Sequence, residues 1–402
     1  MRANKPAGTG GYTSWSPGLR TVYYKEGRVA ITIDKARGCL LGQAVGNALG
    51  APVEGLSRSY ILRTYGPVQD YIDGQQRAAA RGRYRLPGLY TGDTQQALVI
   101  ADVLVENRYF DPEAARQKYI ELSQPCPGLP RGALRDSPAS ALRAALQPAA
   151  PGRTNQTGFP LADNAAAMRI APLGLYYAGE STRLRQAAVQ ASRQTHSDSR
   201  AIAAAVAVAC LVAHLAVHTV GSPDEERAAL RAAATAAMEA EIALANGHEP
   251  APPRFSSTLL LLDPLWEAPT WEVLRTIVIQ ANRQQPPHPI TSPSDSFACA
   301  SVPTAIYLAL HLPNFEQAVT SAVNLGGDAD TVGAISGALA GARWGASNIP
   351  QRWLDGLANT EGILARADAL AGGASKGSIQ PESLLSAERR LSLAQQRAKE
   401  AW

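Results

Sequence analysis

The stretch "NLGGDADTVGAISGALAGARWG", residues 324–345, joins two closely spaced carboxylates to a run of small apolar residues. Within it, glycine recurs at every fourth position, and on a helix residues four apart lie on one face. Because a glycine inside a helix costs about 1 kcal/mol relative to alanine, we predict that a second helix backbone packs closely against this face. The glycines are Gly333, Gly337, Gly341 and Gly345.

A second glycine series with the same spacing lies near the start of the chain. Gln43, Asn47 and Arg343 interrupt the two stretches, which excludes the membrane-helix form of this pattern. The remaining sequence consists mostly of Ala/Leu-rich helical stretches broken by Pro and Gly, and strand-like alternation is rare. We therefore predict an all-α fold, a compact multi-helix domain built around two glycine-faced helices. The second series is Gly38, Gly42, Gly46 and Gly50.

Composition and charge are those of an ordinary globular protein. The chain has 402 residues, of which 46% are hydrophobic and 18% charged, and its net charge is +4. Lys and Arg are scattered rather than clustered, which argues against nucleic-acid binding. The most apolar window, 201–221, is Ala-rich and contains His214 and His218, so we interpret it as a buried central helix and not as a membrane span. The four cysteines form no CxxC pair, which predicts buried free thiols and a cytoplasmic location.

The chain divides into three expected segments. Residues 1–32 form a polar, Gly/Pro-rich flexible arm without a secretory apolar core. This arm is a disordered end, a signal for delivery out of the cell, or a segment that covers a partner. Residues 33–370 form the globular domain. Residues 371–402 carry an exposed amphipathic helix, in which Glu388 and the neighbouring arginines are interpreted as solvated charges.

Asp328 and Asp330 lie in the turn before the glycine-rich helix. An N-cap explains one of them, but a second carboxylate held close by carries an electrostatic cost. A divalent cation between the two removes that cost, and Mg²⁺ or Mn²⁺ binds such oxygen ligands. Thr91 and Asp93 precede another amphipathic helix, and Glu54 follows the first glycine series. If the two glycine series pack together, these helix ends bring the acidic residues near one another.

Two further polar groups interrupt apolar stretches. His196 and Asp198 precede the central Ala-rich helix, where a helix start and a ring suit a phosphate and a base. A purely structural histidine is the alternative. Asn164 and Arg169 lie in the apolar run 163–179. Arg169 either binds a phosphate or pairs with a buried carboxylate.

These pieces, in this order, resemble the ADP-ribosylglycohydrolase family from about residue 36 to about residue 360. The resemblance implies an all-α domain around a central cleft with a binuclear Mg²⁺ or Mn²⁺ centre. There the metals position ADP-ribose and a water that hydrolyses the bond between the distal ribose and its acceptor. The implied partner is ADP-ribose or an ADP-ribosylated protein. The segments that carry the resemblance are "GCLLGQAVGNALGAPVEG", "YTGDTQQALVIADVLVE", "NAAAMRIAPLGLYYAG", "HSDSRAIAAAVA" and "NLGGDADTVGAISGALAGARWG".

The resemblance and the residue pattern together assign roles to particular positions. The catalytic residues are expected to be Glu54, Asp93 and Asp328. The expected metal ligands are Thr91, Asp93, Asp328, Asp330 and Thr331. The expected substrate-binding residues are Asn47, Glu54, Asn164, Arg169, His196, Gly326 and Gly327.

The sequence departs from the family pattern at positions that bear on the metals. Gly92 stands where the family usually has the first of two consecutive aspartates, and Asn47 stands for the aspartate of "GDALG". Ala165 replaces a glycine, and "HSDS" replaces "HPDP". The first two changes remove negative charge and are expected to weaken or abolish one metal site. Three functions remain open: hydrolysis of ADP-ribose linkages with one or two metals, non-hydrolytic binding of ADP-ribose or an ADP-ribosylated protein, and altered chemistry such as cyclisation or transfer.

Overall fold

The computed structural model describes residues 29–73, 84–135, 158–246, 248, 252–372 and 382–401. Within these ranges the regular elements are α-helices and short 3-10 helices, and strand-type pairing is limited to isolated bridges. The predicted all-α fold is therefore confirmed. Most of the predicted 1–32 arm lies outside the described residues.

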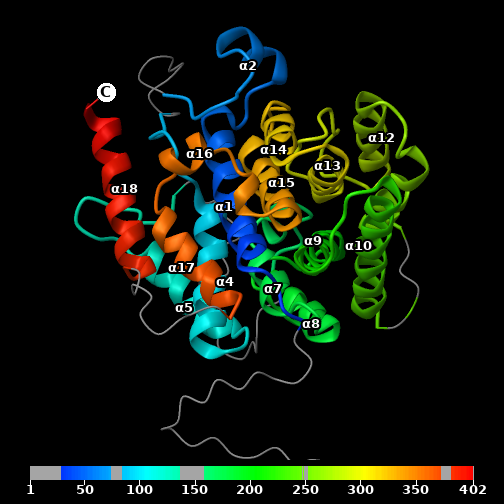
Figure 1. The fold of residues 1–402 in the computed structure, drawn as a ribbon, viewed down its shortest axis with the longest axis horizontal. Coiled ribbons are helices and arrows are strands. Elements are labelled where there is room, and N and C mark those ends of the chain that lie inside the picture. Colours follow the sequence, from blue (N-terminus) through cyan, green and yellow to red (C-terminus); the bar gives the residue numbers. More distant parts are fainter. Residues whose placement is uncertain are drawn as a thin grey trace, which may run out of the picture.

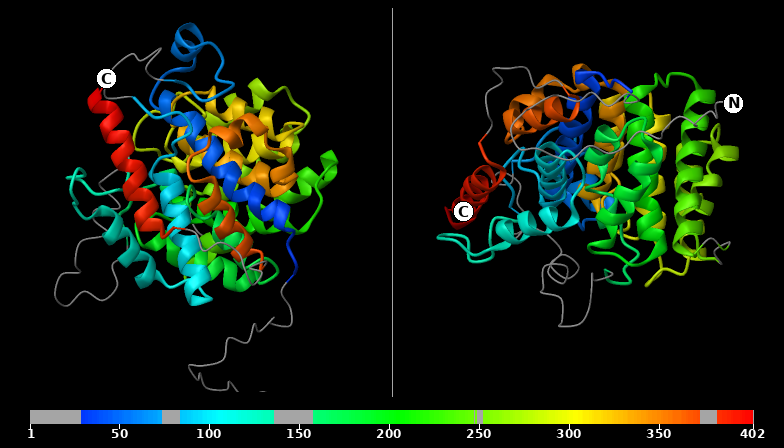
Figure 2. Two further views of the ribbon diagram at one scale, coloured as in Figure 1. Left: turned by 60° about the vertical axis from the view of Figure 1, so that its left-hand side comes forward. Right: turned by 90° about the horizontal axis from the view of Figure 1, so that it is seen from below.

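The helices pack around α1, α9 and α15, while α18 lies at one edge of the molecule and α10 and α12 at the opposite edge (Figures 1 and 2). The first half of the chain contributes α1 Ile33–Gly50, α2 Arg58–Thr64, α4 Gly92–Asn107, α5 Pro112–Ser123, α7 Ala171–Tyr176, α8 Ser181–Arg193 and α9 Ser199–Val217. The second half contributes α10 Pro223–Leu244, α11 Phe255–Leu260, α12 Thr270–Arg283, α13 Ala298–His311, α14 Phe315–Val323, α15 Ala329–Trp344, α16 Gln351–Gly356, α17 Thr360–Leu370 and α18 Leu384–Ala401. Short 3-10 helices are η1 Ala51–Val53, η3 Asn164–Ala166, η4 Asp263–Leu265 and η5 Ala346–Asn348.

The two glycine-faced helices, α1 and α15, pack against each other in antiparallel directions (Figure 1). A Cβ placed at Gly46 lies 1.9 Å from the carbonyl oxygen of Gly333, and one at Gly341 lies 1.8 Å from that of Gly38. Even a methyl group therefore collides with the facing backbone, which explains the repeated glycine. We call this contact the glycine seam. Its facing pairs are Gly38 with Gly341, Gly42 with Gly337, and Gly46 with Gly333.

The ends of the glycine seam differ from the prediction. Gly345 is the C-cap that follows α15, with a φ of 85° that favours glycine, and it still packs against Gly38 and Asp34 of α1. At the other end, Gly50 faces Ala329, whose carbonyl oxygen lies 2.4 Å from a Cβ placed at Gly50. The end of α1 therefore contacts the first turn of α15.

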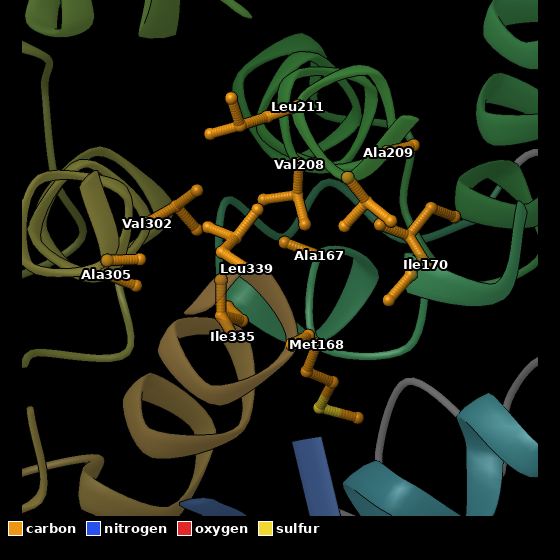
Figure 3. Packing of buried hydrophobic residues seen from close by; sticks show 14 of the residues in the cluster. Ala167, Met168, Ile170, Val208, Ala209, Leu211, Val302, Ala305, Ile335 and Leu339 are labelled. Carbon is orange, nitrogen blue, oxygen red and sulfur yellow. The ribbon is translucent and has the colours of Figure 1, made fainter. Parts of the chain in front are cut away.

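The Ala-rich helix α9 lies inside the protein, as predicted. By length and composition it is apolar enough to cross a membrane, but 78% of its most apolar window is buried within the protein. Figure 3 shows Val208 of α9, Val302 of α13 and Leu339 of α15 meeting in the interior. Many of the buried residues of α9 are alanines, and such small side chains allow neighbouring helices to pack closely around α9.

The four cysteines are free, as predicted. Cys39 and Cys299 are buried, whereas Cys126 and Cys210 are only partly buried. Burial raises the pKa of Cys210 to about 12. The reactive thiolate form is therefore disfavoured at this position.

The C-terminal stretch forms the predicted helix, α18, but the interpretation of Glu388 as a solvated charge is wrong. The Glu388 side chain is fully buried, and its carboxylate lies 2.8 Å from the guanidinium of Arg135. Helical periodicity indicated an amphipathic helix, yet it did not show that a charged residue lies on the buried face. A buried charge of this kind needs a partner, and the partner lies 253 positions earlier in the chain, beyond the reach of a local pattern.

Candidate metal centre

Three acidic residues come together where the end of α1 meets the start of α15. Glu54, Asp328 and Asp330 each offer a carboxylate oxygen, and these oxygens all lie within 4.8 Å of one another. The glycine seam explains the meeting, because α1 and α15 are antiparallel and the segment that leaves α1 arrives beside the turn that enters α15. Glu54 is exposed, Asp328 is half-buried and Asp330 is buried, so the cluster opens to solvent on the Glu54 side.

The double glycine before Asp328 shapes the turn that carries it. Gly326 and Gly327 have φ angles of 72° and 62°, in the region that favours glycine. The Gly327 N–H donates to the Leu56 carbonyl at 2.8 Å, and the Asp328 N–H donates to the Ser294 carbonyl at 2.8 Å. Gly326 and Gly327 thus fix the backbone of the centre, and their predicted contact with a substrate stays a prediction.

Asp328 stands at the N-cap position of α15, but its side chain makes no capping hydrogen bond. Its carboxylate instead accepts a hydrogen bond from the Asn164 side chain at 2.7 Å. Asn164 also reaches the Ser301 hydroxyl at 3.1 Å, so it is held in place from two sides. The N-cap explanation of Asp328 therefore fails, and the carboxylate faces the cluster for another reason.

Asp330 has one carboxylate oxygen with partners and one without. Its Oδ2 accepts from the Thr91 hydroxyl at 3.1 Å and from the Asn47 amide at 3.4 Å. Its Oδ1 is buried and has no hydrogen-bond partner. Buried polar atoms are nearly always satisfied, and an unpartnered carboxylate oxygen beside two other carboxylates fits a bound cation. The residues present therefore suit a divalent metal.

Asp93 lies in the first turn of α4 and accepts a hydrogen bond from the Thr331 hydroxyl at 2.8 Å. Burial, together with the charges of Asp328 and Glu54, raises the pKa of Asp93 to about 7. Burial also raises the pKa values of Asp328 and Asp330. Among the described residues, no Lys or Arg forms an ion pair with Asp93, Asp328 or Asp330. Within the part of the chain that the structure describes, these three aspartates therefore lie close together without an ion-paired Lys or Arg.

Asn47 lies at the centre of the hydrogen bonds that join α1 to α4. Its Oδ1 accepts from the Thr91 N–H at 2.7 Å and from the Thr94 hydroxyl at 3.0 Å. Its Nδ2 donates to the Thr91 hydroxyl at 2.9 Å. An aspartate in this place has no N–H to direct toward Asp330, so the asparagine joins two carboxylate-bearing segments without adding charge.

Gly92 is the first residue of α4 and is buried beside this centre. It has no side-chain oxygen, so Asp93 is the one carboxylate in the first turn of α4. The structure thus brings together most of the residues predicted for the metals and the substrate. These residues are Asn47, Glu54, Thr91, Asp93, Asn164, Asp328, Asp330 and Thr331.

Arg169 and His196 are buried, and their side chains contact other side chains of the protein. Their side chains are 1% and 0% exposed, so neither presents an atom to a ligand in this conformation. Arg169 donates to Gln96 at 2.7 Å and to the Thr195 hydroxyl. Among the described residues Arg169 forms no ion pair with a carboxylate, and its predicted contact with a phosphate stays a prediction.

Asp163 is the residue of this region that sequence reasoning missed. His196 uses both ring nitrogens, one with Thr195 at 2.7 Å and one with Asp163 at 2.7 Å. Burial opposes ionisation of Asp163, but the hydrogen bond and charge of His196 outweigh it and lower the pKa of Asp163. Asp163 directly precedes Asn164 and caps η3, so an Asp-Asn pair at a helix start was the available signal. Asp198, also expected near a ligand, instead caps α9 and pairs with Arg200 at 2.6 Å.

The sequence profile of the ADP-ribosylglycohydrolase family matches residues 28–379. The chain belongs to the ADP-ribosylglycohydrolase family. An uncharacterized protein of Archaeoglobus fulgidus is 30% identical over 82% of this chain and 93% of its own length. The ADP-ribosylarginine hydrolase of Serratia proteamaculans is 26% identical over 84% of this chain and 79% of its own length. A solved structure, described as an ADP-ribosylglycohydrolase-related protein complex, matches at a TM-score of 0.59 with 28% identity and covers 85% of this chain and 99% of that one.

Family membership confirms the resemblance that the glycine series and the acidic motifs indicated. It supports hydrolysis of ADP-ribose linkages as the class of reaction. The family match ends at residue 379, before α18 begins at Leu384. The C-terminal helix therefore lies outside the part of the chain that the family describes.

Proposed function

We propose that this ADP-ribosylglycohydrolase family member hydrolyses ADP-ribose linkages at a divalent-metal centre formed by Glu54, Asp328 and Asp330. The observation that carries the proposal is the Oδ1 atom of Asp330, which is buried without a partner beside two other carboxylates. A buried carboxylate oxygen without a partner destabilises the folded protein. Three converging carboxylates bind a hard cation well. Mg²⁺ and Mn²⁺ suit this all-oxygen ligand set.

Some residues of the centre would bind the cation, and others orient the side chains that bind it. A bound Mg²⁺ or Mn²⁺ supplies Lewis acidity and makes water a stronger nucleophile at neutral pH. Asn164 donates to Asp328 and so fixes which carboxylate oxygen is left for the cation. Thr331 donates to Asp93, which lies beside the centre. Glu54 is the exposed member of the cluster, and it lies where a ribose and a water can enter.

The departures at Gly92 and Asn47 favour one tightly bound cation. The start of α4 lacks a carboxylate at Gly92, and Asn47 is neutral and donates to Asp330. Calorimetric titration with Mn²⁺ tests this expectation. We expect one site in the wild-type protein and a second site in the Gly92→Asp variant. Two sites in the wild type would mean that another group replaces the missing aspartate.

We propose ADP-ribose linked to arginine on a protein as the substrate class, because an ADP-ribosylarginine hydrolase matches most of this chain. The test is chromatographic measurement of ADP-ribose released from arginine-modified protein in the presence of Mn²⁺. We expect Asp330→Asn to lose more than the ~100-fold that loss of an outer partner of a metal ligand can cost. The matched control is Asp355→Asn, which makes the same change at an exposed carboxylate on α16. No release by the wild type from arginine- or serine-modified protein would exclude the hydrolase.

A non-hydrolytic binder of ADP-ribose is the second candidate, and the neutral residues Gly92 and Asn47 favour it. Such a protein keeps one cation and the ribose pocket but lacks the second cation that the family resemblance implies for positioning the water. Calorimetry with ADP-ribose separates the two candidates: binding without product release supports the binder, and absence of binding rules it out. A product whose mass differs from that of ADP-ribose would indicate cyclisation or transfer.

A further inference from the structure

The buried face of α18 carries polar side chains in addition to apolar ones. Glu388, Ser392 and Gln395 are spaced four and three residues apart, so they lie on one face of the helix. All three are buried, and Glu388 has no exposed surface. A helix that docks only to cover a core uses apolar residues on this face. We call these three residues the polar clamp.

Two members of the polar clamp bind the backbones of two separate segments. Gln395 accepts a hydrogen bond from the Leu86 N–H at 2.8 Å and donates to the Tyr84 carbonyl at 2.7 Å. Ser392 donates to the Ala133 carbonyl at 2.6 Å. Figure 1 shows α18 at the edge of the molecule, next to the helices that these segments adjoin. The clamp thereby fixes the chain that leads into α4 and the chain around residue 133.

Glu388 contacts three polar side chains from these segments. Its Oε1 accepts a hydrogen bond from the Tyr90 hydroxyl at 2.6 Å. Its Oε2 accepts one from the Gln95 amide at 2.8 Å and forms an ion pair with the Arg135 guanidinium, also at 2.8 Å. Arg135 is itself only 7% exposed, so the two opposite charges are buried together and each depends on the other.

The peptide that joins Tyr90 to Thr91 is held at both of its polar atoms. Arg135 donates from Nε to the Tyr90 carbonyl at 2.9 Å. On the other side, the Thr91 N–H donates to Asn47 at 2.7 Å. A peptide unit is planar and stiff, so a shift of the Tyr90 carbonyl moves the Thr91 N–H with it. The Thr91 hydroxyl contacts Asp330 at 3.1 Å, which connects this peptide to the acidic cluster.

We infer that Glu388 is a positioning residue for the metal centre, which it reaches through Arg135, Tyr90 and the Tyr90–Thr91 peptide. The inference rests on the proposed metal-dependent function. It assigns to α18, a helix beyond the family match, the task of placing Thr91 against Asp330. Loss of the Glu388 charge leaves Arg135 without its counterion and frees the Tyr90 carbonyl to move. The cation then meets a less ordered set of oxygens.

The experiment compares three variants of the full-length protein with the wild type. Glu388→Gln keeps the shape of the side chain but replaces one carboxylate oxygen with an NH₂ group, which cannot accept a hydrogen bond from the surrounding donors. Tyr90→Phe removes one hydroxyl and leaves the Glu388–Arg135 pair intact. Glu400→Gln is the matched control, because it makes the same change on an exposed face of α18. Each protein is titrated with Mn²⁺ by calorimetry well below its melting temperature, and amide hydrogen exchange is followed in the peptide spanning residues 84–95.

We expect the dissociation constant for Mn²⁺ to rise about tenfold in Glu388→Gln, the lower end of the range for outer partners of metal ligands, and less in Tyr90→Phe. Hydrogen exchange across residues 84–95 should be faster in Glu388→Gln than in Tyr90→Phe, and faster in both than in the wild type. Glu400→Gln should match the wild type. Reduced melting temperatures with unchanged Mn²⁺ affinity would overturn the inference, because they indicate a purely structural helix. If Glu388→Gln does not fold, Tyr90→Phe decides the question alone.

The same titration distinguishes failure of this inference from failure of the proposed function. A wild-type protein that binds no Mn²⁺ would overturn both. A wild-type protein that binds Mn²⁺ and hydrolyses its substrate, alongside Glu388→Gln with equal Mn²⁺ affinity, would overturn only the role of Glu388.

Discussion

The glycine seam and the polar clamp both attach a long helix to the same domain, but by opposite chemistry. In the glycine seam, α1 and α15 approach until a single added methyl group collides with the facing backbone. In the polar clamp, α18 stays further out and reaches the domain through a buried carboxylate, a hydroxyl and an amide. The first contact depends on shape alone, whereas the second depends on every donor finding its acceptor.

This difference matters because both contacts lead to the candidate metal centre. The glycine seam brings the segment after α1 beside the start of α15, which places Glu54 beside Asp328 and Asp330. The polar clamp holds the chain that enters α4 at Thr91. A shape-based contact fixes the separation of two helices, and a hydrogen-bonded contact fixes the orientation of one peptide. The two contacts should therefore respond differently to substitution.

The largest loss of stability is expected when one partner of the buried Glu388–Arg135 pair is removed. Arg135→Met and Glu388→Leu should each lower the free energy of unfolding by about 3–5 kcal/mol, because each leaves one buried charge without its partner. The double variant should lose less than the sum, since no buried charge remains. A denaturant-unfolding double-mutant cycle measures the coupling. Additive losses would show that the pair is solvated rather than buried.

A somewhat smaller effect is expected at the glycine seam. Gly46→Ala should lower the free energy of unfolding by about 3 kcal/mol, the upper end of the range for overpacking, because its Cβ would lie 1.9 Å from a carbonyl oxygen. Gly221→Ala is the control, since a Cβ there meets nothing within 4 Å. Equal unfolding midpoints for the two variants would contradict the close contact of α1 and α15.

A third contact extends the comparison. It is a series of hydrogen bonds that joins Arg169, Thr195, His196 and Asp163. Thr195→Val removes the hydroxyl that joins Arg169 to His196 and should cost about 1–3 kcal/mol, because buried donors are left unsatisfied. The control is Thr235→Val, at an exposed hydroxyl on α10. Thermal unfolding followed by circular dichroism measures both. A loss as small as that of the control would mean that water replaces the hydroxyl.

The smallest effect concerns the charge at the metal centre. The pKa of Asp93 is raised from 3.8 to about 7, so this carboxyl holds its proton more tightly in the folded protein than in the unfolded chain. The stability that it contributes is therefore present at low pH and is lost as the pH rises through about 7. In metal-free protein, Asp93→Asn should flatten the fall in melting temperature between about pH 5 and pH 8, a difference of a few degrees.

A bound cation should reverse this dependence, because it needs deprotonated ligands. Mn²⁺ should raise the melting temperature of the wild type more at pH 8 than at pH 5. Asp330→Asn should show little increase at either pH. An equal Mn²⁺ effect at both pH values would mean that the cation binds away from these carboxylates.

Sequence reasoning anticipated most of the acidic cluster, because its residues stand at helix starts and ends that local patterns mark. Glu54, Asp93, Asp328 and Asp330 each adjoin a glycine-rich or capped helix terminus, and the two glycine series indicated which helices meet. It left the roles of Arg169 and His196 open, and the structure shows that both residues are buried. A polar residue in an apolar run looks the same whether its partner is a ligand or a hidden hydroxyl such as that of Thr195.

The sequence by itself determined the all-α fold, the family and the contact of α1 with α15, because a four-residue glycine repeat allows one kind of partner, another backbone at close range. Only the tertiary structure decided the place of Glu388. Nothing near position 388 distinguishes a buried carboxylate from a solvated one, since its donors come from Tyr90, Gln95 and Arg135, hundreds of positions away. Periodicity reports which residues share a face, and burial depends on what the rest of the chain brings to that face.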